Sequence, residues 1–126
     1  MADINIVSFG YGHAPAPEAH LTIDLRQHFR DPHTTPDFRH LTANDEPVRT
    51  AVLNTPGITD LIHGIAAAVN AFANAPDTRP ITIAAGCTGG RHRAPTFART
   101  LLHRLHADGH SLTIHHRDLD KPVINH

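Results

Sequence analysis

An apolar run that leads into a glycine-rich turn constrains this chain more than any other stretch. Ile81–Ala85 is typical of a buried strand, and Gly86–Gly90 are small residues typical of a tight turn. Pro95 suits the first turn of a helix, where the missing N–H of proline costs no hydrogen bond. A strand, a turn and a helix N-terminus in this order leave unpaired amides beside the positive end of a helix dipole. The sequence therefore predicts an anion-binding strand–turn–helix at Gly86–Arg93.

The side chains in and near this turn fit the same chemistry. Arg91 and Arg93 carry fork-shaped guanidinium donors, and His92 between them can carry a proton. We expect a phosphate or similar anion to be bound by Cys87, Thr88, Gly89, Gly90, Arg91, His92 and Arg93, with His13 and His33 reaching the same place from breaker-rich loops. The alternative is an ordinary strand-to-helix turn with solvated arginines and two plain loop histidines.

Composition limits the class of protein. The chain of 126 residues is long enough for one domain with a real core, and its net charge of −1 gives no global basic signal for nucleic acid. The single cysteine excludes an internal disulfide and fits a reducing compartment. No apolar run approaches the roughly 20 residues of a membrane span, and the N-terminus lacks the pattern of a signal peptide. We expect a cytoplasmic protein that does not contact a membrane.

Hydrophobic periodicity divides the chain into strands and helices. Strands are predicted at Ile4–Phe9, Leu21–Leu25, Ile81–Ala85 and Leu112–His116, and helices at Pro47–Asn54, from Thr55 to near Pro76, and from Ala94 to Gly109. This order predicts a single α/β domain over residues 1–126, with a mixed, mostly parallel sheet flanked by helices. Ile81–Ala85 should be central in the sheet, with a ligand at the carboxyl ends of the strands. Residues 26–46 show no clean period, and such a stretch is often functional.

Cys87 and Arg93 have the Cys-x5-Arg spacing of cysteine-dependent phosphatases, in which a thiolate attacks a bound phosphoryl group. Gly86 stands where these enzymes usually carry histidine, Ala94 stands where they carry a hydroxyl, and no aspartate is clearly aimed as the general acid. We therefore expect no catalytic residues, and Cys87 with Arg93 would be the catalytic pair of the phosphatase alternative. The turn also lacks the Gly-Lys-Ser/Thr of a Walker A loop.

Histidine is unusually frequent, with thirteen residues in the chain. His103 and His106 are three apart on a predicted helix, and His115 and His116 are adjacent, but no second cysteine or carboxylate cluster completes a ligand set. We expect solvated surface histidines, with a structural zinc site as the alternative. No metal and no cofactor is predicted.

Motifs in several places follow one another in a recognisable order. They are Ser8–His13, Ile23–Arg26, Asp31–His33, Arg39–Thr42, Gly86–Arg93 and His116–Leu119. In this order the chain resembles the C-terminal domain of the RapZ/YvcJ family over nearly its whole length. The motif Gly-Cys-Thr-Gly-Gly-basic-His-Arg at Gly86–Arg93 is specific for that domain.

The resemblance implies a function for the predicted anion turn. In the family this domain follows a P-loop nucleotide-binding domain, binds small regulatory RNA, senses glucosamine-6-phosphate and serves as adaptor for an endoribonuclease. Carried over by position, the sugar-phosphate site would use Thr88, Gly89, His92, Arg93 and His33. The leading prediction is therefore a regulatory, non-catalytic domain that binds a phosphorylated metabolite such as an amino-sugar phosphate.

The chain also departs from the family. We expect it to be a stand-alone domain without the P-loop domain, so that nucleotide binding does not carry over. The RapZ tail is rich in lysine and arginine, whereas the end of this chain, after Arg117, holds one lysine and two aspartates. Ala94–Pro95 replaces a serine followed by an apolar residue, which changes how the helix starts. RNA binding as an RNase adaptor is kept as an alternative. Other predicted partners are a protein that carries a P-loop domain and a second copy of the chain.

Overall fold

Four parallel strands form the sheet of the computed structural model, which describes residues 1–124. They are β1 (Asp3–Gly10), β2 (Leu21–Asp24), β3 (Ile81–Cys87) and β4 (Ser111–His116), in the spatial order β2-β3-β1-β4. Every pairing between them is parallel. The predicted α/β class and the central place of the apolar segment, now β3, are confirmed, and the expected mixed character is absent from the described sheet. The end of the expected domain, residues 125–126, lies outside the described residues.

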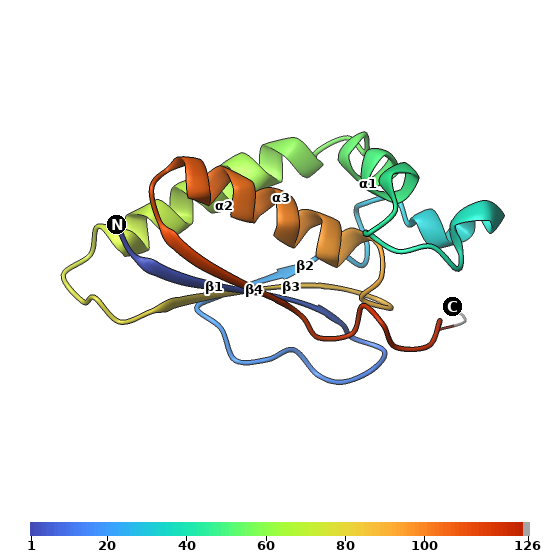
Figure 1. Cartoon of the computed structure of the whole chain (residues 1–126), viewed down its shortest axis with the longest axis horizontal. Coiled ribbons are helices and arrows are strands. Elements are labelled where there is room, and N and C mark those ends of the chain that lie inside the picture. Colours follow the sequence, from blue (N-terminus) through green and yellow to red (C-terminus); the bar gives the residue numbers. More distant parts are fainter. Residues whose placement is uncertain (125–126) are drawn as a thin grey trace.

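The three α-helices cover one face of the sheet (Figure 1). They are α1 (Glu46–Leu53), α2 (Ile58–Ala73) and α3 (Arg93–Ala107). The reason is the direction of the connections: β2 to β3 and β3 to β4 both move the same way across the sheet, so right-handed crossovers place their helices on the same side. The connection from β1 to β2 moves the opposite way, and residues 11–20 accordingly run beneath the other face as a helix-free loop (Figure 1).

The core lies between the sheet and the apolar stripes of α2 and α3. The buried residues recur at helical spacing: Ile58, Ile62, Ala66 and Val69 on α2, and Ala94, Phe97, Ala98, Leu101 and Leu105 on α3. They pack on Ile4, Ile6, Ile83 and Ala85 of the two central strands. Phe72, which extends the predicted stripe of α2, is instead 40% exposed and makes an edge contact with His20. Among the described residues, no helix has the length and apolar character needed to cross a bilayer.

Glycines set two helix ends. Gly57 has φ 93° and precedes the first residue of α2, so this helix begins three residues later than the predicted start at Thr55. Gly109 has φ 92° and follows α3, as its position in the sequence predicts. The aperiodic segment 26–46 contains two single 3-10 turns, Pro32–Thr34 and Pro36–Phe38. The first turn is capped by Asp31, whose carboxylate accepts the backbone N–H of His33 at 2.9 Å.

Candidate anion-binding site

The predicted turn lies at the carboxyl end of β3, where the chain passes from the middle of the sheet into α3. Gly90 has φ 75°, a left-handed conformation that favours glycine. Gly10, the last residue of β1, packs directly against the turn, because a Cβ atom at this position would lie 2.7 Å from the backbone nitrogen of Gly90. The glycines thus let two backbones approach closely and fix the shape of the turn.

The turn exposes a series of unused backbone donors. Within residues 1–124, the N–H groups from Thr88 to Arg93 donate no hydrogen bond to another residue. The next amide, that of Ala94, donates to Sγ of Cys87 at 3.4 Å. No side chain caps α3. Since buried amides in folded proteins almost always have a partner, this row of donors at a helix N-terminus is chemically suited to an anion.

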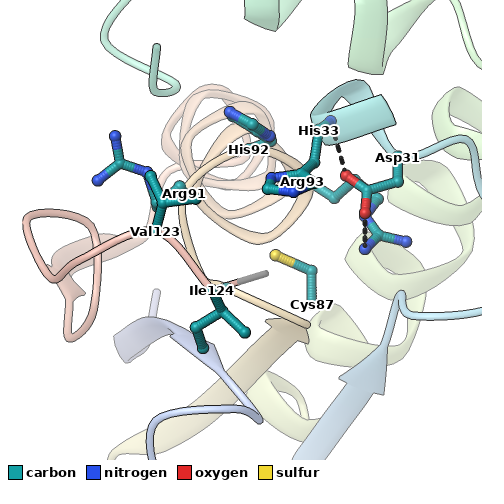
Figure 2. A pocket seen from close by; sticks show the side chains of 9 residues that line it. Asp31, His33, Cys87, Arg91, His92, Arg93, Val123 and Ile124 are labelled. Carbon is teal, nitrogen blue, oxygen red and sulfur yellow. Dashed lines mark hydrogen bonds and ion pairs between the residues drawn. The ribbon is translucent and has the colours of Figure 1, made fainter. Parts of the chain in front are cut away.

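A small pocket lies beside the turn (Figure 2). Its lining residues come from three parts of the chain: Asp31 and His33; Cys87, Gly89, Arg91, His92 and Arg93; and Val123 and Ile124. The cavity measures about 20 Å³, roughly the space that one water molecule needs. The structure thus brings His33 to the turn as predicted, whereas His13 does not line the pocket. Thr88 and Gly90 belong to the turn through their backbones but are not lining residues either.

Two buried histidines stand beside the turn. The rings of His33 and His92 are 6.5 Å apart between centroids. Nε2 of His92 lies 2.8 Å from the carbonyl oxygen of Leu41. Because a carbonyl only accepts, Nε2 carries the proton, and Nδ1 is the nitrogen that changes between acceptor and donor when the ring is protonated.

The guanidinium of Arg93 is engaged with the protein. Its Nη1 donates to the carbonyl oxygens of Leu25, Arg26 and Phe29 at 2.9, 3.0 and 3.3 Å, and its Nη2 pairs with Oδ2 of Asp31 at 3.2 Å (Figure 2). The residue is 3% exposed. In the phosphatase alternative this guanidinium would bind the phosphoryl group. Here it binds residues 25–31, the segment that follows β2. Binding of an anion by the Arg93 side chain stays a prediction, and its backbone N–H is the group that the turn presents.

Arg91 joins the turn to two other segments. Its Nη1 donates to the carbonyl oxygens of Lys121 at 3.0 Å and Leu119 at 3.4 Å, and its Nη2 donates to that of His40 at 3.1 Å. Nε of Arg91 is buried and has no partner among the described residues. Arg91 therefore connects the anion turn with the C-terminal segment and with the end of the 3-10 region.

A buried carboxylate supports the turn from behind. Asp118 is fully buried and accepts the N–H of Gly10 at 2.7 Å, while Arg117 and Lys121 bind the same carboxylate at 2.8 and 2.7 Å. Burial alone would raise the pKa of Asp118, but the hydrogen bonds from Arg117, Gly10 and Lys121 outweigh it and lower the pKa from 3.8 to about 2. Asp118 is thus ionised at neutral pH, and its carboxylate holds β1 against the turn.

The family model of the RapZ C-terminal domain matches residues 2–120. The chain belongs to this family. Its relatives include proteins named nucleotide-binding protein from Thermobifida fusca, 36% identical over 93% of this chain, and from Symbiobacterium thermophilum, 34% identical over 95%. A third, from Frankia alni, is 36% identical over 92% of the chain. The chain spans about two fifths of the length of these curated relatives.

Two lining residues of the pocket lie outside the stretch that the family model matches. They are Val123 and Ile124, and both follow the matched stretch, which ends at residue 120. Sequence reasoning named neither residue, nor Asp31, as part of the site. Asp31 had a signal, because an aspartate before Pro-His can cap a short turn. The signal of Val123 and Ile124 is their apolar character shortly after the charged residues Asp120 and Lys121. Within residues 1–124, no group of three His, Cys, Asp or Glu side chains is arranged to hold a metal ion.

Proposed function

We propose that this RapZ C-terminal domain binds a phosphorylated metabolite at the turn Thr88–Arg93 and acts as a sensor without catalysis. The observation that carries the proposal is the row of unused amides at the N-terminus of α3. A phosphate group offers oxygens on every side, so it can accept several of these donors at once. Arg91, His33 and His92 border the same pocket and add groups that are, or can become, cationic.

An amino-sugar phosphate such as glucosamine-6-phosphate matches the chemistry of the residues that line the pocket. The phosphate would take the amides, while the carboxylate of Asp31, which lines the pocket beside His33, suits an ammonium group and sugar hydroxyls. The family to which the chain belongs supports this choice. The ligand would enter at the carboxyl ends of parallel strands, where α/β sheets commonly bind small molecules.

The alternatives have less support. A cysteine phosphatase needs an arginine on the phosphoryl group, and the guanidinium of Arg93 donates to carbonyl oxygens and to Asp31. RNA binding normally uses a dense set of free cations, whereas the net charge is −1, and Arg26 and Arg79 are paired with Asp24 and Asp77.

Calorimetric titration tests the proposal. Glucosamine-6-phosphate should bind more tightly than inorganic phosphate, and glucosamine without its phosphate should show no measurable binding. Incubation with each phosphate ester should release no inorganic phosphate. Equal binding of glucosamine and its 6-phosphate would refute a phosphate site at this turn. Ester hydrolysis that disappears in Cys87→Ser would support the phosphatase instead.

A further inference from the structure

The C-terminal segment 119–124 borders the candidate pocket at Val123 and Ile124. It follows the buried Asp118, runs past Arg91 and ends with Val123 and Ile124 on the pocket wall (Figure 2). The side chain of Ile124 also occupies the space above Gly12, in the position that a Cβ atom at Gly12 would take. The segment therefore contacts Arg91 of the turn and also Gly12 of the loop after β1.

Arg91 holds this segment in place. Its Nη1 donates to the carbonyl oxygens of Leu119 and Lys121, and the ammonium of Lys121 pairs with Asp118 at 2.7 Å. The backbone of Arg91 belongs to the anion turn, where its amide has no partner among the described residues. The side chain of the same residue holds the segment 119–124. The carbonyl oxygens that accept these hydrogen bonds are uncharged. An anion would accept a stronger hydrogen bond from the guanidinium than they do.

The space beside Val123 and Ile124 is narrow. With Val123 and Ile124 in place, the cavity of about 20 Å³ can hold roughly one water molecule. A phosphate group, with oxygens around a central phosphorus, is several times larger than a water molecule. A phosphate group at this turn and the residues Val123 and Ile124 would therefore compete for the same space.

We propose that residues 119–124 form a strap that competes with the anion for this pocket. The inference rests on the proposed function and adds its regulation: the strap is seated when the pocket is empty and is displaced when a phosphorylated ligand binds. Binding would then transfer the Arg91 guanidinium from the strap carbonyls to the anion. A strap seated in about nine molecules of ten would lower the apparent affinity about tenfold, because only the open fraction can bind.

The test compares three proteins: the full chain, the chain shortened to end at Lys121, and Ile124→Ala. Calorimetry with inorganic phosphate and with glucosamine-6-phosphate measures their affinities. Shortening should raise the affinity roughly tenfold, and Ile124→Ala should raise it less. The matched control is Ile65→Ala, which truncates a similarly half-buried isoleucine on α2, away from the pocket, and should leave the affinity unchanged.

Hydrogen exchange provides a readout that needs no ligand. A seated strap shields the unbonded amides of Thr88–Arg93, so these amides should exchange faster in the shortened chain. Equal exchange rates in the two chains would overturn the strap. Weaker ligand binding after shortening would also overturn it, because residues 122–126 would then hold the ligand rather than compete with it. If neither chain binds phosphate but shortening speeds exchange, the strap stands and the proposed ligand is wrong.

Discussion

Nη1 of Arg93 lies 2.9 Å from the carbonyl oxygen of Leu25, a residue 68 positions earlier in the chain. This bond joins the first turn of α3 to the end of β2. The same guanidinium reaches Arg26, Phe29 and Asp31. Sequence motifs assign Arg93 to ligand binding. In the structure its side chain also holds residues 25–31, which lead directly to His33 at the pocket.

We expect Arg93→Ala to destabilise the fold. The substitution leaves the buried carbonyl of Leu25, the partly buried carbonyls of Arg26 and Phe29, and the Asp31 carboxylate without their donor. Removal of one partner of a fully buried ion pair costs about 3–5 kcal/mol, and we expect less here because the Asp31 side chain is 17% exposed. Urea unfolding should show a clearly lower midpoint. Arg79→Ala is the control: Arg79 is 86% exposed and pairs only at the surface with Asp77, so its midpoint should not change measurably. An unchanged midpoint for Arg93→Ala with lost phosphate binding would instead assign the guanidinium to the ligand.

Gly89→Asp should weaken anion binding without unfolding the protein. A Cβ atom at Gly89 would meet no heavy atom within 4 Å, and this residue lines the pocket, so the new carboxylate fits and faces the anion. Repulsion at this range should lower the affinity for glucosamine-6-phosphate by roughly one to two orders of magnitude. Gly89→Asn has the same shape without the charge and should retain most of the affinity in calorimetry. Equal losses in the two variants would mean that shape, rather than charge, governs the site.

Asp118 should make the protein sensitive to strong acid. Its pKa is lowered in the folded state, so it contributes stability above its ordinary value of 3.8, and this contribution disappears as the pH falls toward about 2. The wild type should be more stable than Asp118→Asn at pH 6, by up to about 2 kcal/mol from this linkage. The difference should shrink between pH 5 and 2 in thermal or urea unfolding. A difference that stays constant over this range would show that Asp118 acts through packing alone.

His116 should act in the same direction, at milder pH. Burial lowers the pKa of His116 below 6.5, and the nearby charges of His115 and Arg99 lower it further, against a smaller opposing effect of Asp120. The unfolded chain then binds the proton more readily, so stability should fall as the pH drops below about 6.5.

The variant His116→Asn keeps a polar partner for Ser8, whose Oγ lies 2.6 Å from Nδ1 of His116. Its free energy of unfolding should depend less on pH between 7 and 5 than that of the wild type. His103→Asn changes an exposed histidine on α3 and serves as the control. If both variants keep the wild-type slope, the acid sensitivity lies elsewhere.

The parts of the fold that sequence predicts well are those with local signals. The apolar run of β3, the stripe of α3 and the stop at Gly109 each depend on residues close in the chain. The direction of each crossover has no local signal, because it depends on which strands pair. The sequence therefore predicted flanking helices, while the structure places all three α-helices on one face.

The position of the turn was predictable, but the contacts of its side chains were not. Small residues followed by Arg-His-Arg locate the turn, since only glycine tolerates the conformation of Gly90 and the close approach of Gly10. The direction of a long side chain depends on distant acceptors, so the carbonyls that bind Arg93 and Arg91 could not be foreseen. The apolar residues Val123 and Ile124, which line the pocket, were also not predicted. The family resemblance draws on basic charges in the tail and not on apolar residues there.

The bond between Gly10 and Asp118 joins residues 108 positions apart and fixes β1 against the turn. During synthesis, the amides of residues 88–93 leave the ribosome before the carboxylate of Asp118, which binds the N–H of Gly10 beside the turn. Parallel pairing across such long loops is slow, because chain entropy must be lost before the contacts form. A nascent chain should therefore gain its ligand affinity only after Asp118 has left the ribosome, and ligand capture would report that the domain has finished folding.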